Sequence, residues 1–265
     1  LRQRATREGH EADIAADLQA LQADRVPDVA DTVDAARQDT IGDDLLRLIF
    51  TACHPLLSAD ARVALTLKLL GGLTTQEIAR AMLQSEPTVA QRIVRAQRTL
   101  REAGVPFEVP RGAALAERLG SVLEVIYLVF NEGYTATRGD DWMRPAMCDE
   151  ALRLARVLLA LMPDEPEVLG LLALLEIQAS RSAARTDAEG RPVLLERQDR
   201  SRWDHLLIRR GLEAIARAES LARTPGPYQL QAAIAACHAR AASADATDWG
   251  RMAALYDDLA RVQPS

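Results

Sequence analysis

Residues 73–101 of this 265-residue chain have the sequence pattern of two short helices joined by a tight turn, which constrains the fold more than any other segment. Thr74, with Glu77 three residues later, is the signature of a capping box, so the first helix is predicted to begin there. Ser85 followed by Pro87 predicts the start of the second helix, because serine caps helix ends and proline is tolerated in the first turn.

A third helix is predicted directly upstream of this pair. Ser58 can cap it, and Gly71-Gly72 can end it. Its interior is dominated by large apolar residues, namely Val63, Leu65, Leu67, Leu69 and Leu70. The segment from Ser58 to Arg101 is therefore predicted to be a compact three-helix unit.

The second helix of the pair is predicted to have an apolar side and a basic side. At about 100° per residue, one narrow stripe carries Val89, Ile93, Ala96 and Leu100, and the opposite side carries Pro87, Gln91, Val94, Arg95 and Arg98. From residue 86 to 101 there are four Arg and one Glu, a net charge of +3. Because arginine presents a planar fork to phosphate and guanine, this pattern favours a DNA-contacting helix. A solvated amphipathic hairpin is the alternative.

Longer motifs resemble a known family. The run from Leu46 to Val109 is similar to region 4 of bacterial extracytoplasmic-function sigma factors. The motifs NEGY (131–134), DRSRWD (199–204) and YQLQAAIAACHARAAS (228–243) resemble the subgroup of these factors with a tetratricopeptide-like C-terminal extension. The resemblance covers nearly the whole chain.

This resemblance implies a set of partners and contact residues. Region 4 of the family recognises the promoter −35 element and contacts the polymerase flap, so the implied partners are promoter DNA and the RNA polymerase core, through its beta flap and beta-prime subunits. The family pattern TVxxRxxRA matches Thr88, Val89, Arg92, Arg95 and Ala96. Gln91 and Arg95 are then expected at base edges, and Thr88, Arg92 and Arg98 at phosphates. Arg92 lies beside the apolar stripe and could instead brace the fold by pairing with an acidic residue such as Glu77.

The N-terminal part departs from the family pattern. Nothing in the chain resembles region 2 of a sigma factor, and residues 1–9 look like the tail of the last helix of that region, so a truncated chain is expected. Between His10 and Leu46 there are ten acidic residues and two arginines, which gives a net charge of −8. This predicts an acidic linker, with one helix near Glu11–Ala23. It could act as a solvated spacer or, as the resemblance implies, thread a basic channel of the polymerase.

Composition favours an all-α protein of about two domains. The apolar fraction is 48%, the aromatic fraction is 4%, and strand-like alternation is missing from long stretches of the sequence. Apolar helices broken by proline continue from Leu115 onward, and the segment from Val168 to Ile177 is apolar almost all round, which is typical of a buried helix. The predicted division is a linker at 1–44, a region 4 domain at 45–109 and a helical, TPR-like regulatory extension at 110–265.

Catalysis and bound cofactors are not expected. The sequence has no Gly-rich phosphate loop and no nucleophile elbow. Cys53-His54 and Cys237-His238 suggest zinc, but helical neighbours point about 100° apart, so no metal site is predicted. The N-terminus is charged and no run of about 18 apolar residues occurs, so no membrane association and a cytoplasmic location are expected.

Polar and aromatic groups within the family motifs of the extension form a possible partner groove. They are Asn131, Glu132, Tyr134, Arg200, Arg202 and Trp203. The alternative is that they brace the helices, while a groove could receive a regulatory protein.

Two functions follow from the whole sequence. One is a sigma factor fragment whose extension modulates activity in cis, and the other is a polymerase-independent helical DNA-binding or protein-scaffold regulator.

Overall fold

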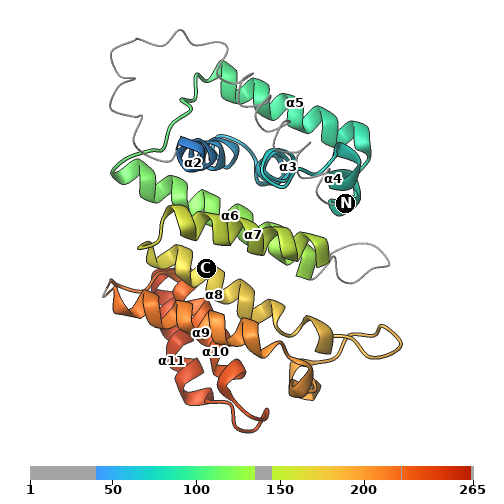
Figure 1. Cartoon of the computed structure of the whole chain (residues 1–265), viewed down its shortest axis with the longest axis vertical. Coiled ribbons are helices and arrows are strands. Elements are labelled where there is room, and N and C mark those ends of the chain that lie inside the picture. Colours follow the sequence, from blue (N-terminus) through green and yellow to red (C-terminus); the bar gives the residue numbers. More distant parts are fainter. Residues whose placement is uncertain (1–39, 135–144, 222, 264–265) are drawn as a thin grey trace. The chain divides into compact units, whose positions relative to one another are not determined.

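The computed structural model describes residues 40–134, 145–221 and 223–263, and this part of the chain is all-helical, as predicted (Figure 1). Its α-helices are α2 (Thr40–Ala52), α3 (Ala59–Leu69), α4 (Thr75–Ala81), α5 (Glu86–Glu102), α6 (Ala113–Tyr134), α7 (Pro145–Leu161), α8 (Pro166–Ala179), α9 (His205–Ser220), α10 (Pro227–Arg240) and α11 (Trp249–Val262). Between α8 and α9 lie three short 3-10 helices, η3 (Ser182–Ala184), η4 (Leu195–Arg197) and η5 (Arg200–Arg202). Within the described residues, one isolated antiparallel bridge joins Thr186 to Pro192, and the Gly190 N–H donates to the Asp187 carbonyl oxygen in the turn between them. The helix predicted at Glu11–Ala23 lies outside the described residues.

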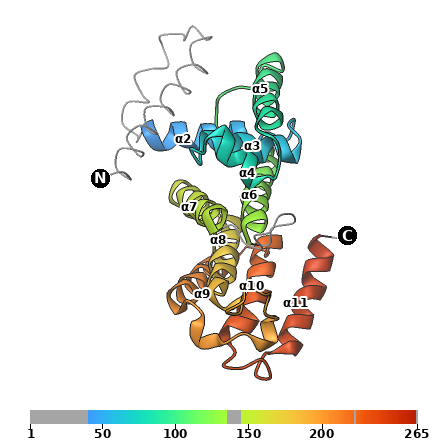
Figure 2. The same cartoon turned by 90° about the vertical axis from the view of Figure 1, so that its right-hand side faces the viewer.

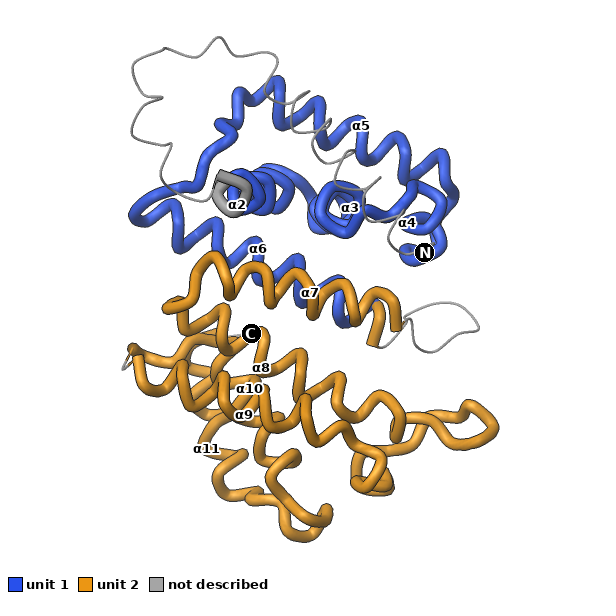
Figure 3. Tube along the Cα trace, in the orientation of Figure 1, with its two compact units in different colours: residues 1–132, 137–141 blue, residues 133–136, 142–265 orange. Residues whose placement is uncertain are grey.

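The chain divides into two compact units (Figure 3). The first comprises residues 1–132 with 137–141, and the second comprises residues 133–136 with 142–265. The first unit includes α6 up to Glu132, and α2 already begins at Thr40, inside the range predicted as linker. The three-part division into 1–44, 45–109 and 110–265 stays a prediction.

Helix α6 is held in the first unit by polar contacts to α2 and to the segments beside it. Arg118 donates from Nη2 to the Phe50 carbonyl oxygen at 2.6 Å, and Ser121 donates to the Cys53 carbonyl oxygen. Arg62 of α3 donates to Ser121 and pairs with Glu124 at 2.8 Å. Arg118 and Ser121 are buried, so their bonds fix the register of α6 against the apolar packing of Phe50 and its neighbours, while Glu124 is exposed.

Helix α8 is the centre of the second unit. Every residue from Val168 to Ile177 is buried, which confirms the prediction for this segment. Helices α7, α9 and α10 pack against α8, and α10 in turn packs against α11 (Figure 2). The Glu167 carboxylate joins α8 to α10, because it accepts hydrogen bonds from the backbone N–H groups of Tyr228 and Gln229 at 3.0 and 3.1 Å. Apolar burial and one polar clamp therefore determine how α10 sits on α8.

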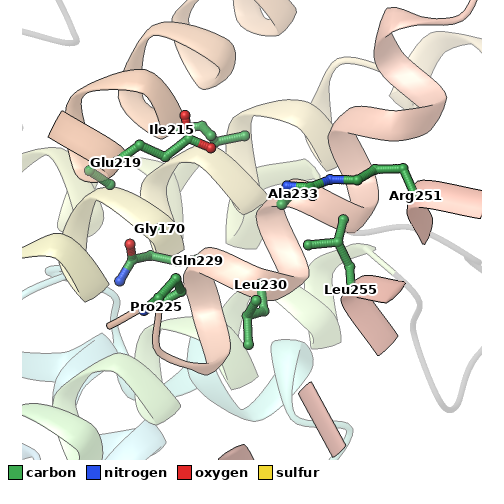
Figure 4. Close-up of a pocket in the computed structure, with 10 residues that line it drawn as sticks. Gly170, Ile215, Glu219, Pro225, Gln229, Leu230, Ala233, Arg251 and Leu255 are labelled. Carbon is green, nitrogen blue, oxygen red and sulfur yellow. The ribbon is translucent and has the colours of Figure 1, made fainter. Parts of the chain in front are cut away.

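Two glycines allow the helices around α8 to approach closely. A Cβ atom at Gly170 would lie 2.6 Å from the backbone nitrogen of Gln229, and one at Gly211 would lie 2.7 Å from Cγ1 of Ile177. Figure 4 shows Gly170 of α8 beside Gln229 of α10, at a small cavity of about 60 Å³. Backbone atoms of α10 cannot move aside as a flexible side chain can, so the Gly170 contact leaves no room for a methyl group.

We expect Gly170→Ala to lower the free energy of unfolding by about 1–3 kcal/mol, because the new methyl group forces α8 and α10 apart. The matched control is Gly120→Ala on α6, where nothing lies within 4 Å of the added Cβ. That change should stabilise by about 0.5–1 kcal/mol, since alanine favours a helix interior. Urea unfolding of each variant measures both effects. A Gly170→Ala protein as stable as the wild type would show that the α8–α10 contact is looser than described.

Candidate nucleic-acid interface

The helix pair α4–α5 begins as its sequence signals predict. The Thr74 hydroxyl accepts from the Glu77 N–H at 3.2 Å, and the Glu77 carboxylate accepts from the Thr74 N–H at 2.8 Å, which completes the predicted capping box. Hydrogen bonds from the backbone and hydroxyl of Thr74 lower the pKa of Glu77. At α5, Ser85 accepts from the Thr88 N–H and Pro87 occupies the first turn. Ser58 precedes α3 at the predicted position, but its side chain makes no cap hydrogen bond.

The turn between α4 and α5 depends on an unusual backbone conformation. The Leu83 N–H bonds to the Arg80 carbonyl and the Gln84 N–H to the Ala79 carbonyl, a Schellman arrangement at the end of α4. The residue at its centre normally adopts a left-handed conformation, and Leu83 does so with φ of 48°. Glycine is usual here because a side chain strains this conformation. The sequence carries no glycine at this turn, so the geometry could not be read from it.

Helix α5 presents the two predicted faces. Val89, Ile93, Ala96 and Leu100 are buried, and α5 packs through them on α3 and α4. Gln91, Val94, Arg95 and Arg98 are exposed on the other side. The structure thus seats the helix by its apolar stripe and leaves a basic face accessible, which is the arrangement of a recognition helix.

The five predicted contact residues differ in what they touch. Arg95 and Gln91 have no hydrogen-bond or ion-pair partner among the described residues, so both are available to a ligand. Arg98 pairs with Glu102 at 3.1 Å, but both side chains are largely exposed and the pair is easily exchanged. The Thr88 hydroxyl lies 2.7 Å from that of Ser85 at the start of the helix.

Arg92 is braced within the three-helix unit. Its guanidinium lies 3.2 Å from the Asp60 carboxylate and donates to the Gln84 side-chain oxygen at 2.7 Å. The partner suggested from sequence was Glu77, and this was wrong, because Glu77 closes its own cap. Asp60 could not be identified from spacing, since it reaches Arg92 across the fold from α3. The phosphate contact of Arg92 remains a prediction. A phosphate would have to compete with Asp60 for the same guanidinium.

A double-mutant cycle on Arg92 and Asp60 is expected to show coupling of about 0.5–1 kcal/mol in the free energy of unfolding. The variants are Arg92→Gln, Asp60→Asn and their combination, compared by thermal unfolding at low and high salt. Coupling should shrink at high salt, because the Asp60 side chain is 61% exposed. A coupling indistinguishable from zero at low salt would show that the Arg92–Asp60 pair does not stabilise the fold. DNA contact would then be the remaining role proposed for Arg92.

The possible groove residues of the extension do not all lie in one unit. Asn131 and Glu132 belong to the first unit, and Glu132 lines a hollow of about 420 Å³ there with Asp60 and Leu128. Tyr134 belongs to the second unit, where Arg185 stacks over its ring at 3.5 Å and donates to its carbonyl oxygen.

The DRSRWD segment mainly makes structural contacts in the second unit. Arg200 donates to the carbonyl oxygens of His238 and Ala241 at the end of α10, and it lies 4.6 Å over the ring of the buried Trp203. Asp204 caps α9 by accepting from the Leu206 and Leu207 N–H groups. Arg202 is exposed. These contacts supply the bracing that the sequence left open, and a partner role for the same residues remains a prediction.

The cysteines are buried thiols. Burial raises the pKa of Cys53 to about 11 and that of Cys148 to about 12, so neither is a ready thiolate. Within the described ranges, no three His, Cys, Asp or Glu side chains are grouped so that they could hold a metal ion. None of the helices described has the length and apolar character that crossing a membrane requires.

Comparisons with known proteins agree with this geometry. Residues 47–100 match the family described as Sigma-70, region 4, and residues 118–219 match a family of unknown function, DUF6596. The chain is 49% identical over 242 residues to an uncharacterized protein of Rhizobium meliloti (strain 1021). This alignment covers 91% of the chain but 56% of the relative, so the chain spans about half the length of that protein. No solved structure matches the chain significantly.

The matched region 4 coincides with the helices that carry the exposed basic face. It begins within α2 and ends within α5, so it includes the whole of α3, α4 and the turn at Leu83. The N-terminal part of the chain therefore carries a helix-turn-helix domain that is similar to region 4 of sigma-70 factors.

Proposed function

We propose that this chain is part of an extracytoplasmic-function sigma factor whose α5 reads the promoter −35 element. The observation that carries the proposal is the exposed face of α5, where Arg95 and Gln91, both without a side-chain partner among the described residues, lie beside Arg98 on a helix that packs through a buried stripe. An arginine fork fits the major-groove edge of guanine, and a glutamine amide fits that of adenine. Thr88 and Arg98 then contact phosphates and set the register, and Arg92 joins them when it leaves Asp60.

The same proposal assigns the polymerase core as partner, through its beta flap and beta-prime subunits, and a cytoplasmic site of action. The region 4 match supports it, since this domain serves promoter recognition together with the polymerase. The helices from α6 onward act as a TPR-like extension that modulates activity in cis or receives a regulatory protein. In support, the second unit is built of helices alone, with α7, α9 and α10 packed against α8 and α11 packed against α10, and helical repeat proteins use such packed helices to present binding surfaces.

Selection of DNA from a random pool tests the promoter-reading role. We expect the chain, mixed with core polymerase, to enrich one short motif, with binding that weakens steeply as salt rises, because phosphate contacts release counterions. The motif should disappear with Arg95→Ala. Enrichment of the same motif with equal affinity in the absence of polymerase would instead favour a polymerase-independent DNA-binding regulator. Failure to enrich any motif under either condition would contradict both.

A further inference from the structure

Val94 is an exposed valine in the middle of α5. It is 62% exposed, and it is the only residue of α5 among the exposed large apolar residues of the described chain. Pro87 is also apolar and exposed, but its place in the first turn of the helix explains it. Valine is a poorer helix former than alanine, arginine or glutamine. Neither packing within the first unit nor helix propensity therefore favours a valine at this position.

Val94 belongs to the same row of side chains as the polar groups proposed to contact DNA. Gln91, Val94, Arg95 and Arg98 are spaced i, i+3, i+4 and i+7, so they lie on one side of the helix, and all four are exposed. The recognition helix of a homeodomain reads the major groove with side chains at this same spacing. A duplex that is bound through Gln91 and Arg95 therefore meets Val94 as well.

Thymine is the base that offers an apolar contact in the major groove. Its 5-methyl group projects into the groove beside the O4 acceptor, whereas cytosine presents an amino donor and no methyl group. Polar side chains read the donors and acceptors of base edges, and an apolar side chain reads the methyl group by contact that excludes water. Valine suits this contact because its side chain is short and stiff in a helix, so little side-chain freedom is lost on binding.

We propose that Val94 is a specificity-determining residue that contacts the 5-methyl group of one thymine in the DNA motif read by α5. The contact rests on the proposed function of α5 and adds an apolar component to its polar contacts. Val94 and Arg95 are neighbours and point about 100° apart. A helix with its side chains is about 10 Å wide and base pairs stack about 3.4 Å apart, so the thymine lies within about three base pairs of the base that Arg95 contacts.

The test removes the methyl group from the DNA and its partner from the protein. Each thymine of the selected motif is replaced in turn by uracil, which keeps every hydrogen-bonding group of the base and loses only the methyl group. Fluorescence anisotropy measures the affinity of the whole chain, bound with core polymerase, for each duplex. We expect replacement at one position, within the stated distance of the base contacted by Arg95, to weaken binding about fourfold, because one methyl group is no longer buried.

Val94→Ala is the decisive variant. It should weaken binding to the thymine duplex about fourfold and leave binding to the uracil duplex nearly unchanged, so that the two bases become equivalent at that position. The melting temperature should not fall, because Val94 is exposed and alanine favours a helix. Val262→Ala on α11 is the same change at another exposed valine, and it should keep the full difference between thymine and uracil.

Failure of the Val94 contact can be told from failure of promoter reading by α5. Suppose that a motif is selected and lost with Arg95→Ala. The Val94 contact is then overturned if no uracil replacement weakens binding, or if Val94→Ala shows the same uracil effect as the wild type, while promoter reading by α5 stands. If no motif is selected, promoter reading by α5 fails, and the Val94 contact fails with it.

Discussion

Arg95→Ala is expected to weaken binding to the selected promoter DNA by about 10- to 100-fold, equivalent to about 1–3 kcal/mol. Arg95 is exposed on α5, and its guanidinium makes no ion pair within the part of the chain that the structure describes. The change therefore removes a contact to a base edge without removing a contact that holds the fold. The melting temperature should stay within experimental error of the wild type.

Two matched variants separate base reading from charge. Arg98→Ala should weaken binding to all sequences alike and reduce the slope of affinity against salt by about one unit, as expected for one phosphate contact. Arg209→Ala on α9 removes the same charge from the second unit, where its ion pair with Glu213 is long at 3.9 Å, and should have little effect. Fluorescence anisotropy with the selected site and with point-changed sites measures all three. Equal losses for Arg95→Ala and Arg209→Ala would mean that α5 has no special role.

Arg156→Ala should lower the free energy of unfolding of the second unit by about 3 kcal/mol. Glu176 of α8 is 3% exposed, and its carboxylate accepts from Arg156 Nη2 of α7 at 2.8 Å. Without Arg156, the carboxylate is left buried beside apolar side chains, where an unpaired charge is costly. Replacing both residues with leucine should restore most of the loss, because an apolar pair requires no desolvation of charge.

Tryptophan fluorescence reports this effect, because the two tryptophans that the structure describes, Trp203 and Trp249, belong to the second unit. The comparison is Arg209→Ala, since its pair with Glu213 is exposed on both sides and should contribute less than about 1 kcal/mol. A loss for Arg156→Ala no larger than for Arg209→Ala would show that water reaches Glu176 and that the pair is not a buried one.

Local signals in the sequence predicted the helix-turn-helix well. The Thr74–Glu77 box, the Ser85 cap and the apolar stripe of α5 all lie within a few residues of the structure they determine, so spacing alone identified them. The buried character of α8 was predicted for the same reason, since its segment is apolar almost all round. Both features depend on residues that lie close together in the sequence, so residue spacing is enough to predict them.

Contacts between residues that lie far apart in the sequence could not be predicted from it. The Asp60–Arg92 pair and the bonds from Arg62 to Ser121 and Glu124 join different helices, and nothing in residue spacing specifies which side chains meet. The left-handed Leu83 was missed because its turn lacks the glycine that normally marks one. Helix α2 begins at Thr40 in a stretch whose acidic composition indicated a linker, and it is stabilised by burial of Leu48, Ile49 and Phe50 further along. Tertiary packing overrides local composition there.

Site-specific photo-crosslinking from α5 tests the central claim most directly. A benzoylphenylalanine at Gln91, on the exposed face, should crosslink to bases within the selected DNA motif when the chain is bound with core polymerase. The same group at Ala253 of α11, also exposed, serves as the control and should give no such product. Base crosslinks from position 91 alone are the predicted result. Retained DNA binding without any crosslink from position 91 would contradict the account.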